Sequence, residues 1–378
     1  MTEPREAMRT IERNPRVWAR EFAADEVWRH EQTRIGRRAW SLLGMTSDVA
    51  ADGDWIVASL AGRSVFVQRF GDTLVGFENI CAHRFFPLRT EARGNGPIRC
   101  GFHGWMYNAQ GTAVGIPACE EMFGCARREI DRRLNRIEVE ACGGLIFGRL
   151  PGDGVPDLSS FLGDMAPALA ALTAGSTADL AVIDQTTDAN WKLCYHITLD
   201  DYHLPTVHPE SFGAGGYLKP HTYRYFAAGP HSAMFTGAFV PKAEFARWIE
   251  ACRSGTLDGK FYRILQVFPN LVVALFPFQE SWFLCISRYL ATSPTRTEVR
   301  SWVRTVPIAD APPPDAAHSA AAVAYLARIL EEDSAVAGRL QTVVHQIDRP
   351  PLLGRQEERI AWFDAAYAAF MAHADQDD

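Results

Sequence analysis

Two short segments, each offering one cysteine and one histidine, constrain this sequence more than any other feature. Cys81 and His83 are separated by one residue, and Cys100 and His103 by two, with sixteen residues (84–99) between the pairs. Thiolates and imidazoles are established ligands of transition metals. The pattern therefore indicates a metal site held between two loops of a small domain.

The way the donors are distributed between the loops indicates which metal is bound. Two cysteines and two histidines suit tetrahedral zinc, but zinc fingers usually pair cysteine with cysteine and histidine with histidine. In a Rieske [2Fe–2S] centre two thiolates bind one iron and two imidazoles bind the other. We therefore predict a Rieske cluster bound by Cys81, His83, Cys100 and His103. Structural zinc is the alternative, and it predicts a colourless protein that a chelator unfolds.

Residues 45–150 have the pattern of a small, all-β domain around this motif. Val65-Phe66-Val67 is part of a short strand, and Gly71-Asp72 reads as the turn to the next strand. A cluster of chain breakers at 151–157 predicts a linker. Residues 1–44 carry many charges among apolar residues at near-helical intervals, which predicts a helical lead-in that packs on the second domain.

Residues 158–378 predict a second, larger domain, so that the chain as a whole is of the α+β class. Its strand candidates, which include one long strand from Phe261 to Phe276, suggest an antiparallel sheet with helices packed on it. The apolar run 271–276 can contribute to a pocket, although core packing is the commoner reason for such a strand. The helices expected in this domain are 160–173, 189–203, 316–347 and 355–373.

Charge and composition exclude several classes of protein. Lys and Arg total 38 against 45 Asp and Glu, and the net charge of −7 gives no reason to expect a nucleic-acid partner. No apolar run resembles a secretory leader or a membrane span, so we expect a cytoplasmic protein without a membrane partner. Thiols stay reduced in that compartment. The cysteines outside the motif are expected to be small buried apolar residues: Cys119, Cys125, Cys142, Cys194, Cys252 and Cys285.

The second domain offers another set of metal donors. Asp200 and His203 are three residues apart and share a helix face. His208 would not share that face on a regular helix, but Pro205 disrupts the backbone hydrogen bonding and lets the chain bend. Two histidines and one carboxylate leave positions open on ferrous iron for dioxygen and a substrate. The missing carboxylate is expected from a distant segment.

At these residues the chain resembles the α subunits of bacterial aromatic-ring-hydroxylating oxygenases. The resemblance implies a helix-grip (START-like) catalytic domain, in which a curved antiparallel sheet folds over helices with iron between them. The segments that carry it are Cys81-Ala82-His83-Arg84, Cys100 to Trp105, Asn190-Trp191-Lys192, Phe268-Pro269-Asn270, a late acidic helix and a closing helix at 356–370.

The resemblance also implies roles for individual residues. His203 and His208 would bind the mononuclear iron, and matching the acidic segment position by position selects Asp333 as the third ligand, with Glu331 and Glu332 as alternatives. Asp200 matches the family's bridging aspartate, which hydrogen-bonds an iron-ligand histidine on its own subunit and a cluster-ligand histidine on the neighbouring one. A head-to-tail contact of this kind must close on itself, and a homotrimer closes it most simply.

The implied function is that of a terminal oxygenase, which uses O2 and NAD(P)H electrons to hydroxylate or dealkylate an organic substrate, with an aromatic one favoured. The chain has no Gly-x-Gly-x-x-Gly loop and no plant-type four-cysteine spacing, so a separate reductase, with or without a ferredoxin, is expected to supply the electrons. The alternative is a Rieske electron-transfer protein without oxygenase activity, whose second domain only docks a partner.

Three residues depart from the family pattern. Phe85 stands where many relatives have glycine, without touching a ligand, and His196-Ile197 replaces a common Glu-Asn pair. Ile197 makes the iron site drier. His196, Asp200 and His203 could instead form a metal triad on one helix, but this would leave His208 and Asp333 without a role. A hydrogen bond from His196 near the subunit interface is the preferred interpretation.

Overall fold

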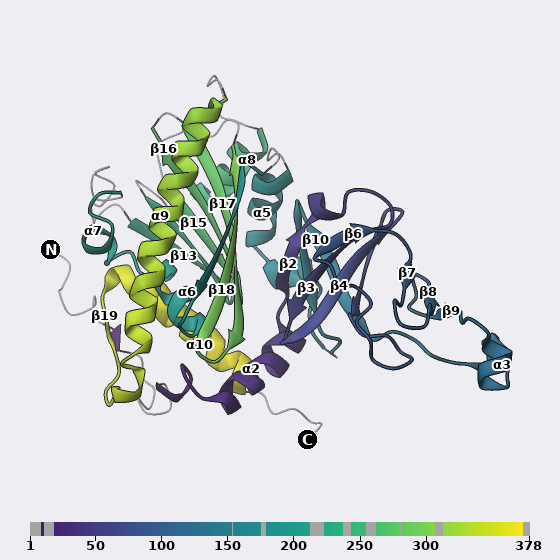
Figure 1. Ribbon diagram of the computed structural model, residues 1–378. Helices are drawn as coiled ribbons and strands as arrows, with labels where there is room; N and C mark the ends of the chain where they lie inside the picture. The colour runs from purple at the N-terminus through teal and green to yellow at the C-terminus, as the bar shows by residue number, and fades with distance from the viewer. Residues whose placement is uncertain are drawn as a thin grey trace. The chain divides into compact units, whose positions relative to one another are not determined.

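The computed structural model describes residues 9–10, 19–152, 154–174, 179–211, 223–236, 243–254, 262–279, 281–306 and 313–372. The chain forms two compact units (Figure 1), one from Gln32–Phe161 and one from Met1–Glu31 together with Leu162–Asp378. The described helix of the predicted lead-in is α2 (Asp25–Arg38). Residues 1–8 and 11–18 of that lead-in lie outside the described residues.

The smaller unit is built from antiparallel strands, as expected for a small β domain. A seven-stranded sheet has the order β2-β11-β10-β5-β4-β3-β6, and a three-stranded sheet has the order β7-β8-β9. The strands are β2 (Ser41–Met45), β3 (Asp54–Leu60), β4 (Arg63–Phe70), β5 (Thr73–Glu78), β6 (Arg93–Asn95), β7 (Ile98–Arg99), β8 (Met106–Tyr107), β9 (Ala113–Gly115), β10 (Arg136–Cys142) and β11 (Leu145–Arg149). Short helical segments are η2 (Thr46–Val49), α3 (Cys119–Phe123) and η3 (Arg127–Glu129).

Strand β4 shows how side-chain alternation divides this unit into two cores. Successive side chains of a strand point to opposite faces of the sheet. Val65 and Val67 accordingly join one buried cluster, whereas Phe66 joins another that also contains Cys81 and Cys100. The cysteines of the metal motif thus lie against the apolar core on one face of the sheet.

The larger unit contains a seven-stranded antiparallel sheet in the order β12-β18-β17-β16-β15-β14-β13. Its strands are β12 (Ala181–Thr187), β13 (Tyr223–Ala228), β14 (His231–Thr236), β15 (Arg263–Val267), β16 (Leu271–Phe278), β17 (Ser281–Ser293) and β18 (Arg296–Thr305). A separate two-stranded sheet pairs β1 (Arg9–Thr10) with β19 (Leu352–Leu353). The helical segments are α5 (Met165–Ala174), α6 (Trp191–Leu199), α7 (Leu204–Val207), α8 (Ala243–Ser254), α9 (Ala316–Gln341), η5 (Val344–Gln346), η6 (Arg355–Glu357) and α10 (Glu358–Ala372). Helix α4 (Leu158–Leu162) spans the point at which the chain passes from one unit to the other.

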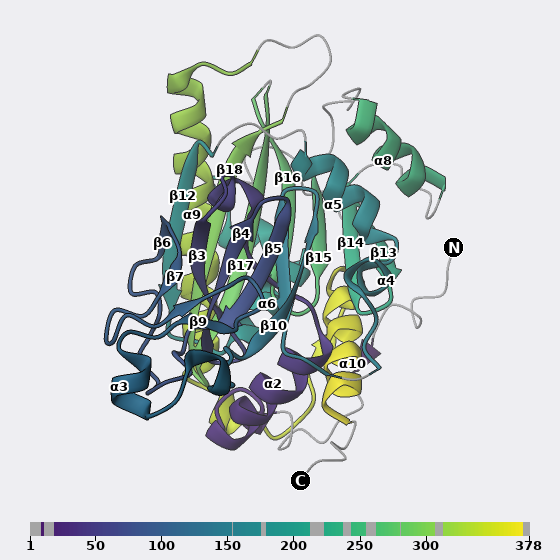
Figure 2. The same ribbon diagram turned by 90° about the vertical axis from the view of Figure 1, so that its right-hand side faces the viewer.

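The sheet of the larger unit curves over α6, α9 and α10 (Figure 1), which agrees with the expected helix-grip arrangement. Ala322 and Leu326 of α9 pack against Phe276, Phe283 and Val303 of the sheet. Figure 2 shows α9 alongside β12, with α5 and α8 next to each other elsewhere in the unit. No described helix is both long and apolar enough to cross a membrane.

The single strand predicted from Phe261 to Phe276 is wrong. The structure contains two strands there, β15 and β16, which pair with each other through a tight reversal in which Val267 faces Leu271. Both strands are apolar, so the sequence pattern continues unchanged through the reversal. The sequence pattern also did not predict helix α8.

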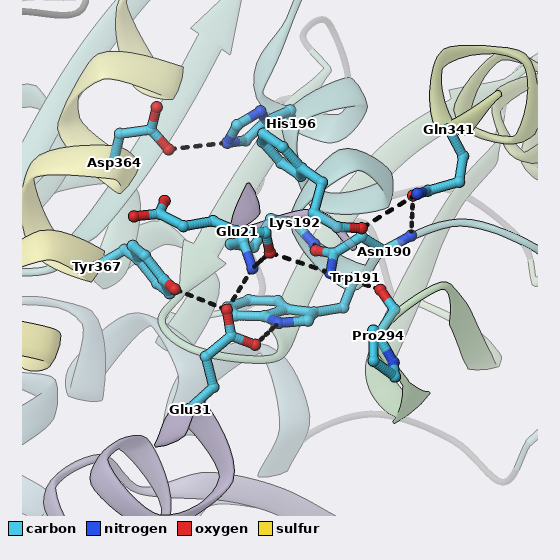
Figure 3. A network of polar contacts seen from close by, with 11 residues as sticks. Glu21, Glu31, Asn190, Trp191, Lys192, His196, Pro294, Gln341, Asp364 and Tyr367 are labelled. Carbon is cyan, nitrogen blue, oxygen red and sulfur yellow. Dashed lines mark hydrogen bonds and ion pairs between the residues drawn. The ribbon is translucent and has the colours of Figure 1, made fainter. Parts of the chain in front are cut away.

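A buried polar network fixes the start of α6, the helix that leads into the second metal motif (Figure 3). The Asn190 side chain caps the helix by accepting a hydrogen bond from the Lys192 backbone N–H at 3.0 Å. The Lys192 ammonium pairs with the Glu31 carboxylate of α2, and both side chains are fully buried. Glu31 also accepts hydrogen bonds from the Trp191 indole at 2.9 Å and from the Tyr367 hydroxyl at 2.7 Å. The Asn-Trp-Lys segment is therefore an anchor for α6.

Candidate metal centres

The two cysteine–histidine segments form loops with the same backbone hydrogen bonds. In each loop the cysteine N–H donates to the carbonyl five residues on, at 2.8 Å for both Cys81 and Cys100. The amide four residues on, which belongs to Phe85 in one loop and Gly104 in the other, donates to the cysteine carbonyl at 3.0 Å. The two loops therefore present their cysteines from equivalent backbone positions.

This equivalence gives a physical meaning to the departure at Phe85. Gly104 has a φ of +73° and Phe85 has a φ of +59°, both in the left-handed region. That conformation costs a non-glycine residue about 1–2 kcal/mol. The Phe85 side chain is 80% exposed, so little packing offsets this cost. One loop of the motif is locally strained and the other is not.

Replacing Phe85 by glycine is expected to stabilise the smaller unit by about 1 kcal/mol, because relief of the left-handed strain exceeds the added entropy of the unfolded chain. Thermal unfolding of the cluster-loaded protein, followed by its visible absorbance, measures this. Phe85→Ala is the matched control, since it removes the ring but keeps the Cβ and should give no gain. Equal gains in both variants would show that the exposed ring, and not the backbone, is responsible.

The four predicted ligand side chains lie together at one place in the smaller unit. The Cys81 and Cys100 thiols are buried and within hydrogen-bonding reach of each other. The imidazole rings of His83 and His103 have centroids 4.7 Å apart. Two backbone N–H groups of its own loop donate to the Cys100 sulfur, and the Tyr107 hydroxyl lies 3.0 Å from the Cys81 sulfur.

These residues fit a cluster with thiolates on one iron and imidazoles on the other. The His83 Nδ1 is buried, and no hydrogen-bond partner for it lies in the described part of the chain. Its ring is stacked on Trp105 at 4.7 Å, which fixes its direction. Burial, followed by repulsion from His103, lowers the pKa of His83 and favours the neutral form that binds metal. A buried, oriented and unpaired imidazole nitrogen is what a metal ligand requires.

A second group of donors lies in the larger unit. His203 immediately precedes α7, His208 immediately follows it, and Asp333 lies on α9. The two Nε2 atoms are 3.2 Å apart, and the Asp333 Oδ1 lies 3.4 Å from that of His203 and 3.0 Å from that of His208. Among the described residues this is the group whose ligand atoms come within 4.8 Å of one another. The three residues matched from the sequence thus converge on one point.

Each histidine of this group also contacts a second carboxylate through its other ring nitrogen. The His203 Nδ1 lies 3.5 Å from Asp200, and the His208 Nδ1 lies 2.7 Å from Glu332. Such outer carboxylates fix the ring orientation and raise the basicity of metal-bound histidines. From the sequence, Glu332 was considered only as an alternative to Asp333 for the third iron ligand. Its spacing gave no signal for the contact, because Glu332 and His208 lie on separate segments.

The surrounding carboxylates raise the pKa of both histidines and so favour their protonated form when no metal is bound. Burial lowers the pKa of His203, but Asp200 and Asp333 outweigh this effect and raise the pKa to about 10. The pKa of His208 is also raised, since Asp333 and Glu332 outweigh the effect of burial. Concentrated negative charge at this point suits a divalent cation, which would replace the protons.

Of the alternative ligands, Glu332 contacts the outer nitrogen of His208, and the others lie away from the donor group. The His196 Nε2 contacts Asp364 of α10 at 3.0 Å (Figure 3), which agrees with a hydrogen-bonding role and not with the triad on α6. Glu331 is exposed. Ile197 lines the same cavity as the donor group, so its apolar side chain lies where it would make the iron site drier, as expected from the sequence.

A cavity of about 70 Å³, open to solvent on one side, lies beside the His203, His208 and Asp333 group. Its wall comes from α6, α9 and the sheet. Val272, Ala274 and Phe276 line it, whereas their neighbours on the strand do not. The remaining lining residues are Ile197, Thr198, Asp200, Asp201, Leu204, Tyr262, Ile264, Cys285, Ser287, Tyr289, Leu326, Ile329 and Leu330.

Two family models match this chain. The model described as "Ring hydroxylating alpha subunit (catalytic domain)" matches residues 172–373, and the "Rieske [2Fe-2S] domain" model matches residues 39–133. A similar solved structure is naphthalene 1,2-dioxygenase from Rhodococcus sp. bound to indole, with a TM-score of 0.76, 22% identity and 93% of each chain covered. Another is the quaternary ammonium Rieske monooxygenase CntA with L-carnitine, with a TM-score of 0.75, 16% identity and coverage of 93% and 94%. At these identities the likeness shows the fold.

Curated relatives match over part of their length. The N,N-dimethyl phenylurea N-demethylase subunit alpha of Sphingobium sp. (strain YBL2) is 30% identical over 198 residues, which is 50% of this chain and 42% of the relative. The benzene 1,2-dioxygenase subunit alpha of Pseudomonas putida is 30% identical over 199 residues, which is 51% of this chain and 44% of the relative. The matched region therefore spans less than half the length of these relatives.

Proposed function

Since this chain belongs to the ring-hydroxylating α-subunit family and carries a Rieske domain ahead of the catalytic domain, we propose that it is the terminal oxygenase of a multicomponent system. It would take electrons from NAD(P)H through a separate reductase, with or without a ferredoxin, and use O2 to hydroxylate or dealkylate an organic substrate. The domains imply one Rieske cluster and one mononuclear iron. The observation that carries the proposal is the convergence of His203, His208 and Asp333 on the wall of a cavity.

Each residue of the site has a defined part in this proposal. Cys81, Cys100, His83 and His103 hold the cluster, and His203, His208 and Asp333 hold the iron, which when bound supplies the place where O2, electrons and substrate meet. Asp200 and Glu332 keep the two histidine rings oriented toward it.

The cavity wall restricts what the substrate can be. Most of its lining is apolar or aromatic, with tyrosine, serine and threonine hydroxyls as the neutral polar groups, and no Lys or Arg lines it among the described residues. Besides Asp333, two carboxylates line it, and each faces a partner: Asp200 faces His203 and Asp201 pairs with Arg359. An apolar wall excludes water and binds apolar surface. We therefore favour an uncharged, largely apolar substrate, such as an aromatic compound. Dioxygenation and N-demethylation, the reactions that the relatives' names state, both fit such a site.

Electron transfer between subunits is part of the proposal. Asp200 matches the residue that bridges the two metal centres across an interface in the family, and a similar solved structure, of a quaternary ammonium Rieske monooxygenase, is described as giving insights into inter-subunit electron transfer. We propose a homotrimer in which a cluster-ligand histidine of one subunit faces Asp200 of the next. Analytical ultracentrifugation would test the trimer independently of activity.

A single-turnover experiment tests the oxygenase function without a partner reductase. The anaerobically purified protein, loaded with iron and reduced with dithionite, is mixed with 18O2 and indole, the compound bound in one of the similar structures. We expect the cluster to reoxidise and indole to acquire 18O. Reoxidation that yields no labelled product with indole or with a panel of neutral aromatic and N-methyl compounds would favour the electron-transfer alternative.

Metal affinity should rise with pH. A metal must displace the proton that the carboxylates hold on His203, whose pKa is raised to about 10 in the metal-free protein. Between pH 7 and 9 the apparent affinity for Co2+ at this site is expected to rise at least about tenfold per pH unit, because the pKa of His208 is raised as well, and to level off above the pKa. Visible absorbance titration measures this. An affinity that does not change with pH would contradict the raised pKa.

A further inference from the structure

Arg359 of α10 is a fully buried arginine that no sequence motif singled out. Its Nη2 donates to the Asp201 Oδ2 at 2.9 Å and to the Thr198 carbonyl at 3.2 Å. Asp201 is also buried, and its backbone N–H donates to the Gln356 carbonyl at 3.0 Å. Figure 1 shows that α10 runs beside α6.

These contacts lie on both sides of Asp200 in the chain. Thr198 is two residues before Asp200, within the last turn of α6, and Asp201 is the next residue after it. The Asp200 carboxylate accepts hydrogen bonds from the Tyr202 and His203 backbone N–H groups at 2.6 and 3.2 Å, and its other oxygen lies 3.5 Å from the His203 Nδ1. The direction of this carboxylate therefore depends on the backbone that Arg359 holds.

The cost of burying two charges indicates that the Arg359–Asp201 ion pair does more than fill space. Two buried charges are costly to remove from water, and replacing such a pair by apolar residues is often neutral or stabilising. The Nε and Nη1 of Arg359 are buried and lack an acceptor within the described residues, so the guanidinium does not find a full set of partners. A gain in folding stability therefore explains the buried Arg359–Asp201 pair poorly. Precise placement of residues 198–201 explains it better.

We propose that Arg359 is a positioning residue, which sets the Asp200 carboxylate against His203 by clamping the Thr198 carbonyl on one side of Asp200 and the Asp201 carboxylate on the other. This inference rests on the proposed function, since it assigns Arg359 to the same electron-transfer route. It adds a residue that acts on the route through Asp200 and that touches neither metal centre.

A double-mutant cycle tests the clamp. The rate of cluster reoxidation in a single turnover is measured for the unchanged protein, Arg359→Met, Asp200→Asn and the combination. We expect each single variant to slow reoxidation at least about tenfold, the size of effect that outer residues have at metal sites. If Arg359 acts through Asp200, Arg359→Met should slow the Asp200→Asn protein by less than about twofold further. Additive losses would overturn the proposal.

Asp364→Asn is the matched control, because Asp364 is another buried residue of α10 that contacts α6, but it does so through His196, one helical turn before Asp200 (Figure 3), and not at the residues that flank Asp200. Its effect on reoxidation should be small and should add to that of Asp200→Asn. If Arg359→Met does not fold, Asp201→Asn with Arg359→Met removes both charges of the pair and should show the same slow reoxidation. Normal reoxidation in that neutral pair would also reject the clamp.

Co2+ binding gives a readout that does not depend on turnover. The cobalt absorption spectrum and affinity report the geometry around His203, so Arg359→Met and Asp200→Asn should change both in the same way, and their combination should add little. Asp364→Asn should leave the spectrum unchanged. If the unchanged protein binds Co2+ normally but oxidises no substrate, the proposed function fails while the cobalt cycle still decides the role of Arg359.

Discussion

Substitution of His208 by alanine is expected to abolish substrate oxidation while leaving the Rieske cluster in place. His208 is fully buried, and its two ring nitrogens contact Asp333 and Glu332, so its loss removes one of three ligands and releases an outer carboxylate. Metal affinity should fall by more than the roughly 10- to 100-fold that outer residues contribute. Iron analysis and the electron paramagnetic resonance spectrum of the reduced protein measure the two centres separately.

His196→Gln is the matched control for this prediction. His196 is a buried histidine of the same region, but its imidazole contacts Asp364 and not the donor group. The variant should keep the mononuclear iron and most of the activity. Loss of iron in His196→Gln together with its retention in His208→Ala would show that the triad of His196, Asp200 and His203 binds the metal.

Cys100→Ser should remove the cluster as a whole. Its thiol lies buried beside that of Cys81, and the loop's own N–H groups point at its sulfur, an arrangement that suits a thiolate ligand. Serine offers a weaker ligand for this iron, so both irons and both sulfides of the cluster are expected to be lost, and substrate oxidation with them. Acid-labile sulfide and the Rieske signal measure the loss.

Cys142→Ser provides the comparison within the same unit, because Cys142 ends strand β10 and is not among the metal-donor groups found in the described part of the chain. It should retain full sulfide content. The mononuclear site of Cys100→Ser should still bind Co2+, since its donors come from the larger unit. A Cys100→Ser protein that keeps its sulfide and its Rieske signal would require a different set of cluster ligands.

The sequence by itself determined the features that depend on short segments. The cluster motif could be recognised because ligand and loop lie within four consecutive residues, so their spacing is set by local backbone geometry. His203 and His208 do meet, but the expected local geometry was wrong: α6 ends at Leu199, so Asp200 and His203 share no helix, and Pro205 lies in the first turn of α7 instead of breaking a helix. A proline in the first turn of a helix costs no hydrogen bond, because its missing N–H would have no partner there. Side-chain alternation predicted strands well wherever a turn signal such as Gly71, with its φ of +55°, interrupted them.

Only the tertiary structure decided which distant side chains meet. Glu332 reaches His208 across 124 residues, and Arg359 reaches Asp201 across 158, and neither contact has a local pattern that announces it. Likewise, the position of α9 decides which face of β16 lines the cavity. Because β16 is apolar on both faces, its sequence does not show which face that is. The local spacing of donor residues determines which metal a segment can bind. The packing of separate segments around one core determines which distant side chains orient those donors.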